Sequence, residues 1–471
     1  MRSVPFLVTV LVLCTQSAVA QGQQVVNLVD AKTILLDSAE LAKMPVYTSL
    51  EKALKEPHQV IRLHLKDAAT DLWDEIFEDS LQQLPASLTK LTFLQELVIE
   101  NYELRTLPVW IGKFPYLQRL QIRRCNLRML SREIAPLQYL KVLDLQDNML
   151  EKLPASIKAL QQLHTLNLSG NRLQHFPPEI FSLPALRVLN LSDNEIHHWS
   201  TPPADYVARS LVEINLSQNH LKSLPKTLAA FPALVELNLQ NNHLSEIPFG
   251  FASHGKIRRL NLSINGLQEL PSDVAHLEEI QELDLSHNHF FYFPEVICRL
   301  PKLRSLDISH NLLRELPEQI GNLKTLEQLS LNANKLATLP AGFEQLEQLS
   351  ELVLWKNNFT HLPPVLLRLN KLVKLDLNSN RISSLPSTIG QMKNLQVLIL
   401  WGNRLDELPE EICQLGNLQA IDLMSNQLHH IPDCMAQMSS LKVIDLDHNQ
   451  LSKEEKQRLQ QVFAKIQISL D

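Results

Sequence analysis

The stretch Leu163-His-Thr-Leu166-Asn-Leu168-Ser-Gly-Asn171-Arg-Leu173 contains the pattern that decides how this chain folds. The same spacing, L-x-x-L-x-L-x-x-N-x-L, recurs at residues 140–150, 234–244 and 303–313. Its asparagine returns every 23 residues, apart from one step of 25 between Asn194 and Asn219. Two earlier frames have Tyr102 and Cys125 in this position, which makes sixteen units in register. A fixed period of this length predicts a solenoid built from stacked units. The asparagines are Asn148, Asn171, Asn194, Asn219, Asn242, Asn265, Asn288, Asn311, Asn334, Asn357, Asn380, Asn403, Asn426 and Asn449.

Each position of the unit has a physical role. Leu166 and Leu168 alternate with polar residues, the period-two pattern of a half-buried strand. Asn171 ends the strand, and a side-chain amide there can both donate to and accept from the backbone of a buried turn. A Leu-Pro pair such as Leu339-Pro340 then closes the turn and leads into a short helical segment. The pattern predicts an α/β solenoid with a parallel concave sheet of about 17 strands and short helical or 3-10 returns on the convex side.

The 23-residue form L-x-x-L-P-x-x-I resembles the leucine-rich repeats of Scribble-type scaffolds and of plant intracellular Ras-group proteins. This resemblance covers Leu94 to about Leu451. Residues 56–65, EPHQVIRLHL, resemble the opening strand of secreted bacterial leucine-rich-repeat proteins. The resemblance implies a leucine-rich-repeat horseshoe and a binding role, but it does not identify a ligand.

Four segments are expected along the chain. Arg2, the apolar run from Pro5 to Cys14 and the motif Ala18-Val19-Ala20 indicate a signal peptide over residues 1–20. Residues 21–90 form an N-terminal cap with a first degenerate strand, and residues 91–451 hold the sixteen-unit array. Residues 452–471 form a C-terminal capping helix and an edge strand. The signal peptide predicts export to the periplasm, the cell surface or the medium.

Both ends need covers, because the last layer of a solenoid exposes leucines. At the N-terminal side we expect a helix over residues 49–55, a strand over 60–65 and a helical return over 72–84. Residues 21–43 show no strong period, and part of this segment is expected to lack structure. At the other end, Ser452 and Glu455 indicate a capping box that starts a helix over about residues 453–464. Leu459, Val462 and Phe463 would cover the last layer, and residues 466–470 are expected to add a strand.

Charge and cysteine content narrow the possible partners. The formal net charge of −7 argues against a nucleic-acid partner, which usually needs a basic face. After the signal peptide no apolar stretch approaches about 18 residues, so no membrane span is expected. Cys413 and Cys434 fall in adjacent repeats, where a bridge is allowed in an oxidising compartment. Two half-buried thiols are the favoured interpretation of this pair.

No motif for catalysis or for a cofactor is present in the sequence. Phosphate loops, G-x-G-x-x-G, C-x-x-C and G-x-S-x-G are all missing, so we expect no enzyme and no cofactor. His287 and His310 occupy the same position in neighbouring repeats, near Asp284 and Asp307. A metal site needs further ligands and support, so solvated histidines are favoured and no metal is assigned.

Two surface clusters and one insertion complete the pattern. Glu96, Glu100 and Glu103 should pair with Arg119, Arg123 and Arg124 of the next repeat. The polar series Asn167, Asn190, Asn215, Asn238, Asn261, Asp284 and Asp307 is expected to form a hydrogen-bonded ladder along the concave face, with a polar floor for a peptide or sugar as the alternative. The two-residue insertion lies within residues 197–210, where Trp199 takes a leucine position, and it is expected to bulge on the convex side.

A candidate binding site lies on the concave strands toward the C-terminus. Its tryptophans, two repeats apart, should be separated by roughly 10 Å. Exposed aromatic and aliphatic side chains rimmed by charge are typical of interaction sites. The residues assigned to the site are Val353, Trp355, Lys374, Ile399, Trp401, Arg404 and Met424.

The predicted function is non-enzymatic binding of a protein or an extended polymer on the concave face. One alternative is a carbohydrate-binding or adhesion protein of the cell envelope, because paired tryptophans also stack on sugar rings. A second alternative is an intracellular scaffold for a small GTPase, against which the signal peptide argues. The sequence leaves the oligomeric state open.

Overall fold

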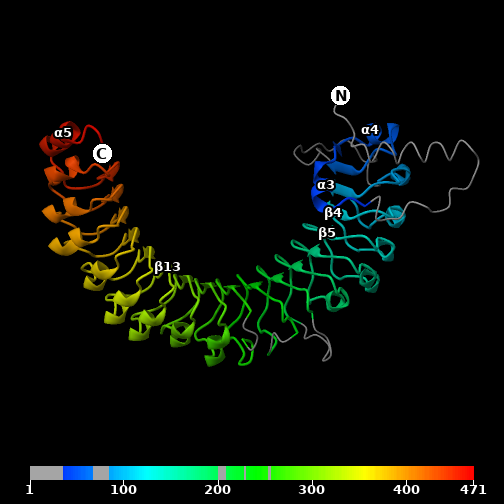
Figure 1. Cartoon of the computed structure of the whole chain (residues 1–471), viewed down its shortest axis with the longest axis horizontal. Helices are drawn as coiled ribbons and strands as arrows, with labels where there is room; N and C mark the ends of the chain where they lie inside the picture. Colours follow the sequence, from blue (N-terminus) through cyan, green and yellow to red (C-terminus); the bar gives the residue numbers. More distant parts are fainter. Residues whose placement is uncertain (1–34, 67–83, 200–207, 227–229, 253–255) are drawn as a thin grey trace, which may run out of the picture. The chain divides into compact units, whose positions relative to one another are not determined.

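The computed structural model describes residues 35–66, 84–199, 208–226, 230–252 and 256–471. The expected signal peptide and residues 72–83 of the expected helical return lie outside them. The chain divides into two units. Unit 1 comprises residues 1–220 and 230–234, and unit 2 comprises residues 221–229 and 235–471. Within each unit the strands line the inner side of the curve and short 3-10 helices line the outer side (Figure 1). The described residues contain nineteen strands, where about seventeen were predicted.

All strand pairs in each unit are parallel and in register, so equivalent residues of successive repeats face one another. Most strands are three residues long, with a buried leucine or isoleucine at the centre. Unit 1 holds β1 Val46–Tyr47, β2 Arg62–Lys66, β3 Glu96–Glu100, β4 Arg119–Arg123, β5 Val142–Asp144, β6 Thr165–Asn167, β7 Val188–Asn190 and β8 Glu213–Asn215. Unit 2 holds β9 Glu236–Asn238, β10 Arg259–Asn261, β11 Glu282–Asp284, β12 Ser305–Asp307, β13 Gln328–Ser330, β14 Glu351–Val353, β15 Lys374–Asp376, β16 Val397–Ile399, β17 Ala420–Asp422, β18 Val443–Asp445 and β19 Gln467–Ser469.

Most returns on the outer side are 3-10 helices that begin after a proline, usually that of a Leu-Pro pair, whereas η4 begins after Ser131. Pro317, for example, has φ −74° and ψ 154°, and its carbonyl accepts the N–H of Ile320 at 3.1 Å. Proline lacks an N–H and favours this φ, so it suits the residue before the helix. The 3-10 helices are η2 Ala86–Lys90, η3 Val109–Lys113, η4 Arg132–Ile134, η5 Ala155–Ala159, η6 Pro178–Ser182, η7 Ser272–His276, η8 Glu295–Arg299, η9 Glu318–Asn322, η10 Ala341–Gln345, η11 Pro364–Arg368, η12 Ser387–Gln391, η13 Glu410–Gln414 and η14 Asp433–Gln437.

The asparagine position forms the predicted spine of buried amides. Nδ2 of Asn288 donates to the carbonyls of Leu285 and Ser286 in its own repeat and of Leu262 in the preceding one. Its Oδ1 accepts the N–H of Leu267 at 3.0 Å. One side chain therefore closes its own turn and joins it to the neighbouring repeat, which leaves few buried backbone groups unpaired.

Cys125 fills the asparagine position as the weak donor that was predicted. Its Sγ donates to the carbonyl of Arg123 at 3.1 Å, and burial raises the pKa of its thiol to about 11. A thiol cannot accept the neighbouring N–H as an amide does. The N–H of Leu104 bonds instead to the backbone carbonyl of Cys125 at 2.8 Å. In the repeat before it, Tyr102 is only half-buried, so this unit lacks the regular spine contact.

The N-terminal cap differs from the prediction in two places. The helix α4 Leu50–Lys55 is confirmed, with Ser49 accepting the N–H of Lys52, and the strand β2 lies where one was expected. Residues 21–43 were expected to be partly without structure. An unpredicted helix, α3 Ser38–Lys43, forms in the described part of this segment, and residues 21–34 lie outside the described residues. Asp37 and Glu40 build a reciprocal capping box at the start of α3, which offsets the weak apolar pattern. The short strand β1 was not predicted.

The C-terminal cap is α5 Lys453–Val462 followed by β19, which pairs with β18 as predicted. Ser452 accepts the N–H of Glu455, but the carboxylate of Glu455 accepts the N–H of Ile431 and binds Arg458 instead of completing the capping box. Leu459 and Phe463 are buried against the last layer. Val462 is 41% exposed, so its assignment to the cover is wrong: it lies on the solvent side of the helix.

Residues 200–207 of the segment 197–210 that contains the insertion lie outside the described residues, so the expected bulge stays a prediction. Trp199 does take the leucine position, with 6% of its surface exposed, and it stacks on Phe176 with ring centroids 5.6 Å apart. Among the described residues no helix combines the length and apolarity needed to cross a membrane.

Candidate binding site on the inner face

Four positions of each repeat face the inner side of the sheet. They are the first and third residues of the three-residue strand and the second and third residues after it. In the β14 repeat they are Glu351, Val353, Trp355 and Lys356, whereas Leu352 and Leu354 are fully buried. We call the third strand residue the ladder row, the second residue after the strand the turn row, and the third residue after it the left-handed row.

The ladder row is occupied mainly by asparagine and aspartate, which make a local hydrogen bond. Oδ1 of Asp307 accepts the N–H of Ser309, two residues on, at 2.9 Å. Asp144 also accepts from the guanidinium of Arg123 in the preceding repeat. The hydrogen bond that recurs along the described part of this row is nevertheless made within one repeat, so a series of local turns replaces the predicted ladder from repeat to repeat. The row members that accept this bond are Asp144, Asn167, Asn190, Asn215, Asn238, Asn261, Asp284, Asp307, Asp376, Asp422 and Asp445.

Val353 and Ile399 interrupt the ladder row with side chains that cannot accept a hydrogen bond. In the same two repeats the turn row holds Trp355 and Trp401. All four side chains are half-buried. Each of these repeats gives up a hydrogen bond at its inner face and gains an apolar surface there.

Backbone hydrogen bonds place the turn row of these repeats side by side. Lys356 donates its N–H to the carbonyl of Asn378, and Ser379 donates to Trp401, at 2.9 and 2.8 Å. Gly402 donates in the same way to Met424 at 2.8 Å. The side chains therefore follow one another in the order Trp355, Asn378, Trp401, Met424. We call Val353, Trp355, Ile399, Trp401 and Met424 the tryptophan patch.

The two cationic members of the predicted site have different positions. Lys374 lies on the inner face, where its Nζ contacts Oε1 of Glu351 at 2.6 Å, so its charge is paired. Arg404 follows Asn403, after the inner-face positions of its repeat, and is exposed. Arg404 thus lies in the turn that leads away from the inner face and not within the patch.

The left-handed row carries a backbone feature that the sequence analysis missed. His287, His310 and Lys356 have φ values of 52–53°, and Ile264 has φ 54°. This conformation suits glycine and asparagine and is costly for a β-branched side chain. Ile264 is also 41% exposed. A strained, exposed isoleucine lengthens the apolar part of the inner face toward the N-terminal side of unit 2.

His287 and His310 are joined to the tryptophan patch. Their rings stack with centroids 3.9 Å apart, and the ring of His310 meets Trp355 edge-on at 5.4 Å. Burial, with the charges of His287 and Lys356, lowers the pKa of His310, while Asp307 opposes this shift. No group of three or more metal-ligating side chains is arranged to hold an ion in the described part of the chain.

Carboxylates dominate the charge of the inner face of unit 2. Burial, followed by repulsion from Asp284, raises the pKa of Asp307, although its hydrogen bonds to Ser309 oppose the shift. Burial likewise raises the pKa of Asp422, with Asp445 and Asp376 adding to the effect. In both cases the charged form is held at a cost that a cation nearby would offset.

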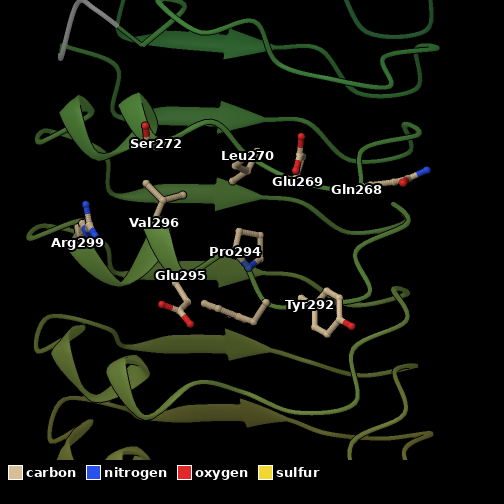
Figure 2. Close-up of a pocket in the computed structure, with 10 residues that line it drawn as sticks. Gln268, Glu269, Leu270, Ser272, Tyr292, Pro294, Glu295, Val296 and Arg299 are labelled. Atoms are coloured by element: carbon tan, nitrogen blue, oxygen red, sulfur yellow. The ribbon is translucent and has the colours of Figure 1, made fainter.

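A separate pocket of about 400 Å³ lies between two repeats of unit 2, away from the inner-face positions (Figure 2). Tyr292 and Arg299 lie at opposite ends of the view, and the carboxylates of Glu269 and Glu295 point in different directions. The polar groups therefore do not converge on one point. Phe291 and Tyr292 occupy positions that are polar or small in most repeats, and Arg314 lies over the Phe291 ring at 4.9 Å. This pocket was not predicted.

In unit 1 the charged cluster pairs largely as expected. Glu96, 2% exposed, contacts Arg62 at 2.8 Å and Arg119 at 3.6 Å, and Glu100 contacts Arg123 at 3.4 Å. Burial would raise the pKa of Glu96, but hydrogen bonds from His64 and Arg62 outweigh it, so the pKa is lowered. Arg124 pairs with Asp147 rather than with Glu103.

Family models for leucine-rich repeats match most of the chain. The leucine rich repeat model matches residues 115–173, 161–201, 255–313 and 393–451, and a leucine-rich repeat region model matches residues 295–380. A further leucine rich repeat model matches residues 233–254 and 371–392. The chain belongs to the leucine-rich-repeat family. No curated protein sequence matches this leucine-rich-repeat protein.

Solved structures support the same assignment. A leucine-rich-repeat protein of Leptospira interrogans is 32% identical with a TM-score of 0.73, and the match covers 90% of this chain and 99% of that one. The ectodomain of a plant membrane receptor kinase from Arabidopsis thaliana, in complex with Casparian strip integrity factor 2, is 25% identical with a TM-score of 0.58. That match covers 90% of this chain and 55% of the receptor. A chain of the Toll–Spatzle complex of Drosophila is 20% identical with a TM-score of 0.62. That match covers 90% of this chain and 59% of the matched chain, and at this identity it shows only that the fold is shared.

Proposed function

We propose that this protein is an exported binding protein that holds a protein partner on the inner face of unit 2. The tryptophan patch provides the apolar anchors of this surface. The leucine-rich-repeat fold is typically non-enzymatic, and the receptor ectodomain from Arabidopsis is in complex with Casparian strip integrity factor 2. Neither finding identifies a partner, so the argument depends on the inner-face residues themselves.

One observation carries the proposal: two repeats replace a local hydrogen bond by an apolar pair. Eleven ladder-row residues accept the N–H two positions on, whereas Val353 and Ile399 cannot. Trp355 and Trp401 follow in the turn row of the same repeats. These side chains add nothing to the leucine core, which is complete behind them. Aromatic side chains at such positions are typical anchors in protein interfaces.

Export is supported by the cysteine pair. Cys413 and Cys434 form a disulfide with their Cα atoms 5.9 Å apart, so the favoured interpretation as two thiols is wrong. Adjacent parallel repeats bring the two residues within bonding range, which sequence spacing alone did not decide. Disulfides persist mainly in oxidising compartments, which favours the periplasm, the cell surface or the medium over an intracellular scaffold for a small GTPase.

The experiment is affinity capture with the disulfide-bonded protein. We expect a protein partner that is retained by the wild type and lost from a Trp355→Ala/Trp401→Ala variant. The matched control is Phe249→Ala/Tyr292→Ala, which removes two aromatic side chains that are 73% and 70% exposed and lie outside the inner face. Equal loss of the partner from both variants would indicate nonspecific binding to exposed aromatic side chains. Capture of a glycan in place of a protein would support the carbohydrate-binding alternative.

A further inference from the structure

The inference starts from a buried acceptor that has no donor. Asn378 is 7% exposed, and its Nδ2 donates to Oδ1 of Asp376 at 2.7 Å. Its own Oδ1 has no hydrogen-bond partner. The amide cannot be turned around, because only its nitrogen can donate to the carboxylate. Buried acceptors are usually paired, and an N–H group of a bound molecule that reached this atom would supply the missing donor.

Trp355 and Trp401 lie on either side of this acceptor. The backbone bonds of Lys356 to Asn378 and of Ser379 to Trp401 place the three turn-row residues in consecutive repeats. Two strand spacings separate the tryptophans, or roughly 10 Å. Both indole rings are half-buried and therefore keep a surface that a ligand can cover. Asn378 thus lies in the repeat between those of the two tryptophans.

The charge around this point is negative. On the inner face of β9–β18, nine carboxylates stand against three cations, and two of those cations are already paired, Arg259 with Glu236 and Lys374 with Glu351. The carboxylates are Glu236, Glu282, Asp284, Asp307, Glu351, Asp376, Asp422, Asp445 and Asp447, and the remaining cation is Lys356. Among the described residues, Asp376 takes part in no ion pair within contact distance. Burial raises its pKa, while the hydrogen bonds from Asn378 and the charge of Lys374 oppose the shift.

We propose that Trp355, Asp376, Asn378 and Trp401 form a subsite for one cationic side chain, an arginine or a lysine, presented by a basic protein partner. This inference rests on the proposed function, because it describes the same inner face. It adds the chemistry of the group that is recognised and therefore the class of partner.

Each residue of the subsite favours a cation for a separate reason. The indole rings attract a cation over their faces, and tryptophan does so best of the aromatic residues. The carboxylate of Asp376 gains a counter-charge in a half-buried position. Oδ1 of Asn378 gains the N–H donor that it lacks. A neutral ligand could supply only the hydrogen bond to Oδ1 of Asn378, and the carboxylate of Asp376 would repel an acidic ligand.

The test uses a capped hexa-arginine peptide as the probe, titrated into the full disulfide-bonded protein while tryptophan fluorescence is followed at about 0.1 M salt. We expect saturable binding that Asp376→Asn weakens by about tenfold or more. The variant keeps its local turn, because asparagine makes the same bond at Asn167 and Asn190. The matched control is Asp445→Asn, which removes the same charge from the same row away from the tryptophans and should change affinity by less than about threefold. A capped hexa-glutamate peptide should not bind.

Two outcomes would overturn the inference. One is equal weakening by Asp376→Asn and Asp445→Asn, which would show attraction to the acidic face without a subsite. The other is no binding of the arginine peptide. If the captured partner is still lost from the tryptophan variant in that second case, the proposed function stands and only the cationic subsite fails. If neither the peptide nor any partner depends on the tryptophans, both proposals fail.

Discussion

The imidazole rings of His287 and His310 stack with their centroids 3.9 Å apart, although they belong to different repeats. In-register parallel strands bring equivalent positions of successive repeats together. Side chains at the same position of neighbouring repeats can therefore contact each other directly. The charge of His287 is among the causes that lower the pKa of His310, after burial.

The first prediction concerns stability between about pH 5 and pH 7.5. Burial and the positive charges of His287 and Lys356 lower the pKa of His310 below its usual value in the folded state. The unfolded chain then binds the proton first as the pH falls, so stability is full above about pH 6.5 and declines below it. Thermal unfolding should show a smaller loss on acidification for His310→Gln than for the wild type. His276→Gln, in the exposed part of η7, is the control and should leave the loss unchanged.

The second prediction concerns Asp307, whose pKa is raised by burial and then by Asp284. A raised acid pKa means that ionisation costs folding free energy at neutral pH. Asp307→Asn keeps the bond to the N–H of Ser309 and removes the charge, so we expect the melting temperature at pH 7 to rise by about 1–3 °C. At about pH 3, where aspartate is largely protonated in both states, the gain should disappear. A gain that is equal at both pH values would contradict the electrostatic explanation.

The third prediction tests the strain at Ile264. Asparagine tolerates the left-handed conformation far better than a β-branched residue, so Ile264→Asn should stabilise unit 2 by about 1 kcal/mol. Ile264→Val keeps the branch at Cβ and should give no gain. Denaturant unfolding of the three proteins provides the measurement. If Ile264→Asn lowers stability, the isoleucine is held by packing that outweighs its backbone strain.

The fourth prediction concerns the asparagine spine. Asn288→Ala leaves the N–H of Leu267 without its buried partner. It also removes one of the two spine amides that donate to each of the carbonyls of Leu262 and Leu285, which keep Asn265 and Asn311. We expect a loss of about 1–3 kcal/mol, the cost of one buried unsatisfied group. Hydrogen exchange should accelerate in the two adjoining repeats first, because a solenoid is stabilised by neighbour contacts. Asn322→Ala, an exposed asparagine in η9, should leave exchange unchanged.

The sequence predicted the repeat unit, the parallel sheet and the spine because each depends on local periodicity. Leucines such as Leu166 alternate with polar residues along each strand, and the asparagine spine places one buried amide in each turn. The tryptophan patch could be predicted for the same reason: fixed offsets from Asn357 and Asn403 place Trp355 and Trp401 on the inner face. Arg404 was assigned to the same site, but its offset after Asn403 places it in the outgoing turn, outside the inner-face positions.

What the sequence did not predict depends on contacts between particular side chains. The Oδ1 of Asn378 is unpaired while its Nδ2 donates to Asp376, and no sequence pattern predicts this contact. The left-handed row was missed because asparagine, aspartate and glycine, which favour a positive φ, fill only part of it. Lysine, histidine and isoleucine occupy other positions of the row, so the sequence shows no consistent residue type there. The helix α3 was missed because its start is fixed by the capping side chains of Asp37 and Glu40 rather than by apolar period.

The most direct test of the account is hydroxyl-radical footprinting of this protein alone and with its captured partner. The tryptophan patch is proposed as the centre of the interface, so oxidation of Trp355 and Trp401 should fall several-fold in the complex. Oxidation of Phe249 and Tyr292, which lie outside the inner face, should not change. Protection of Phe249 and Tyr292 with both tryptophans still fully reactive would contradict the account.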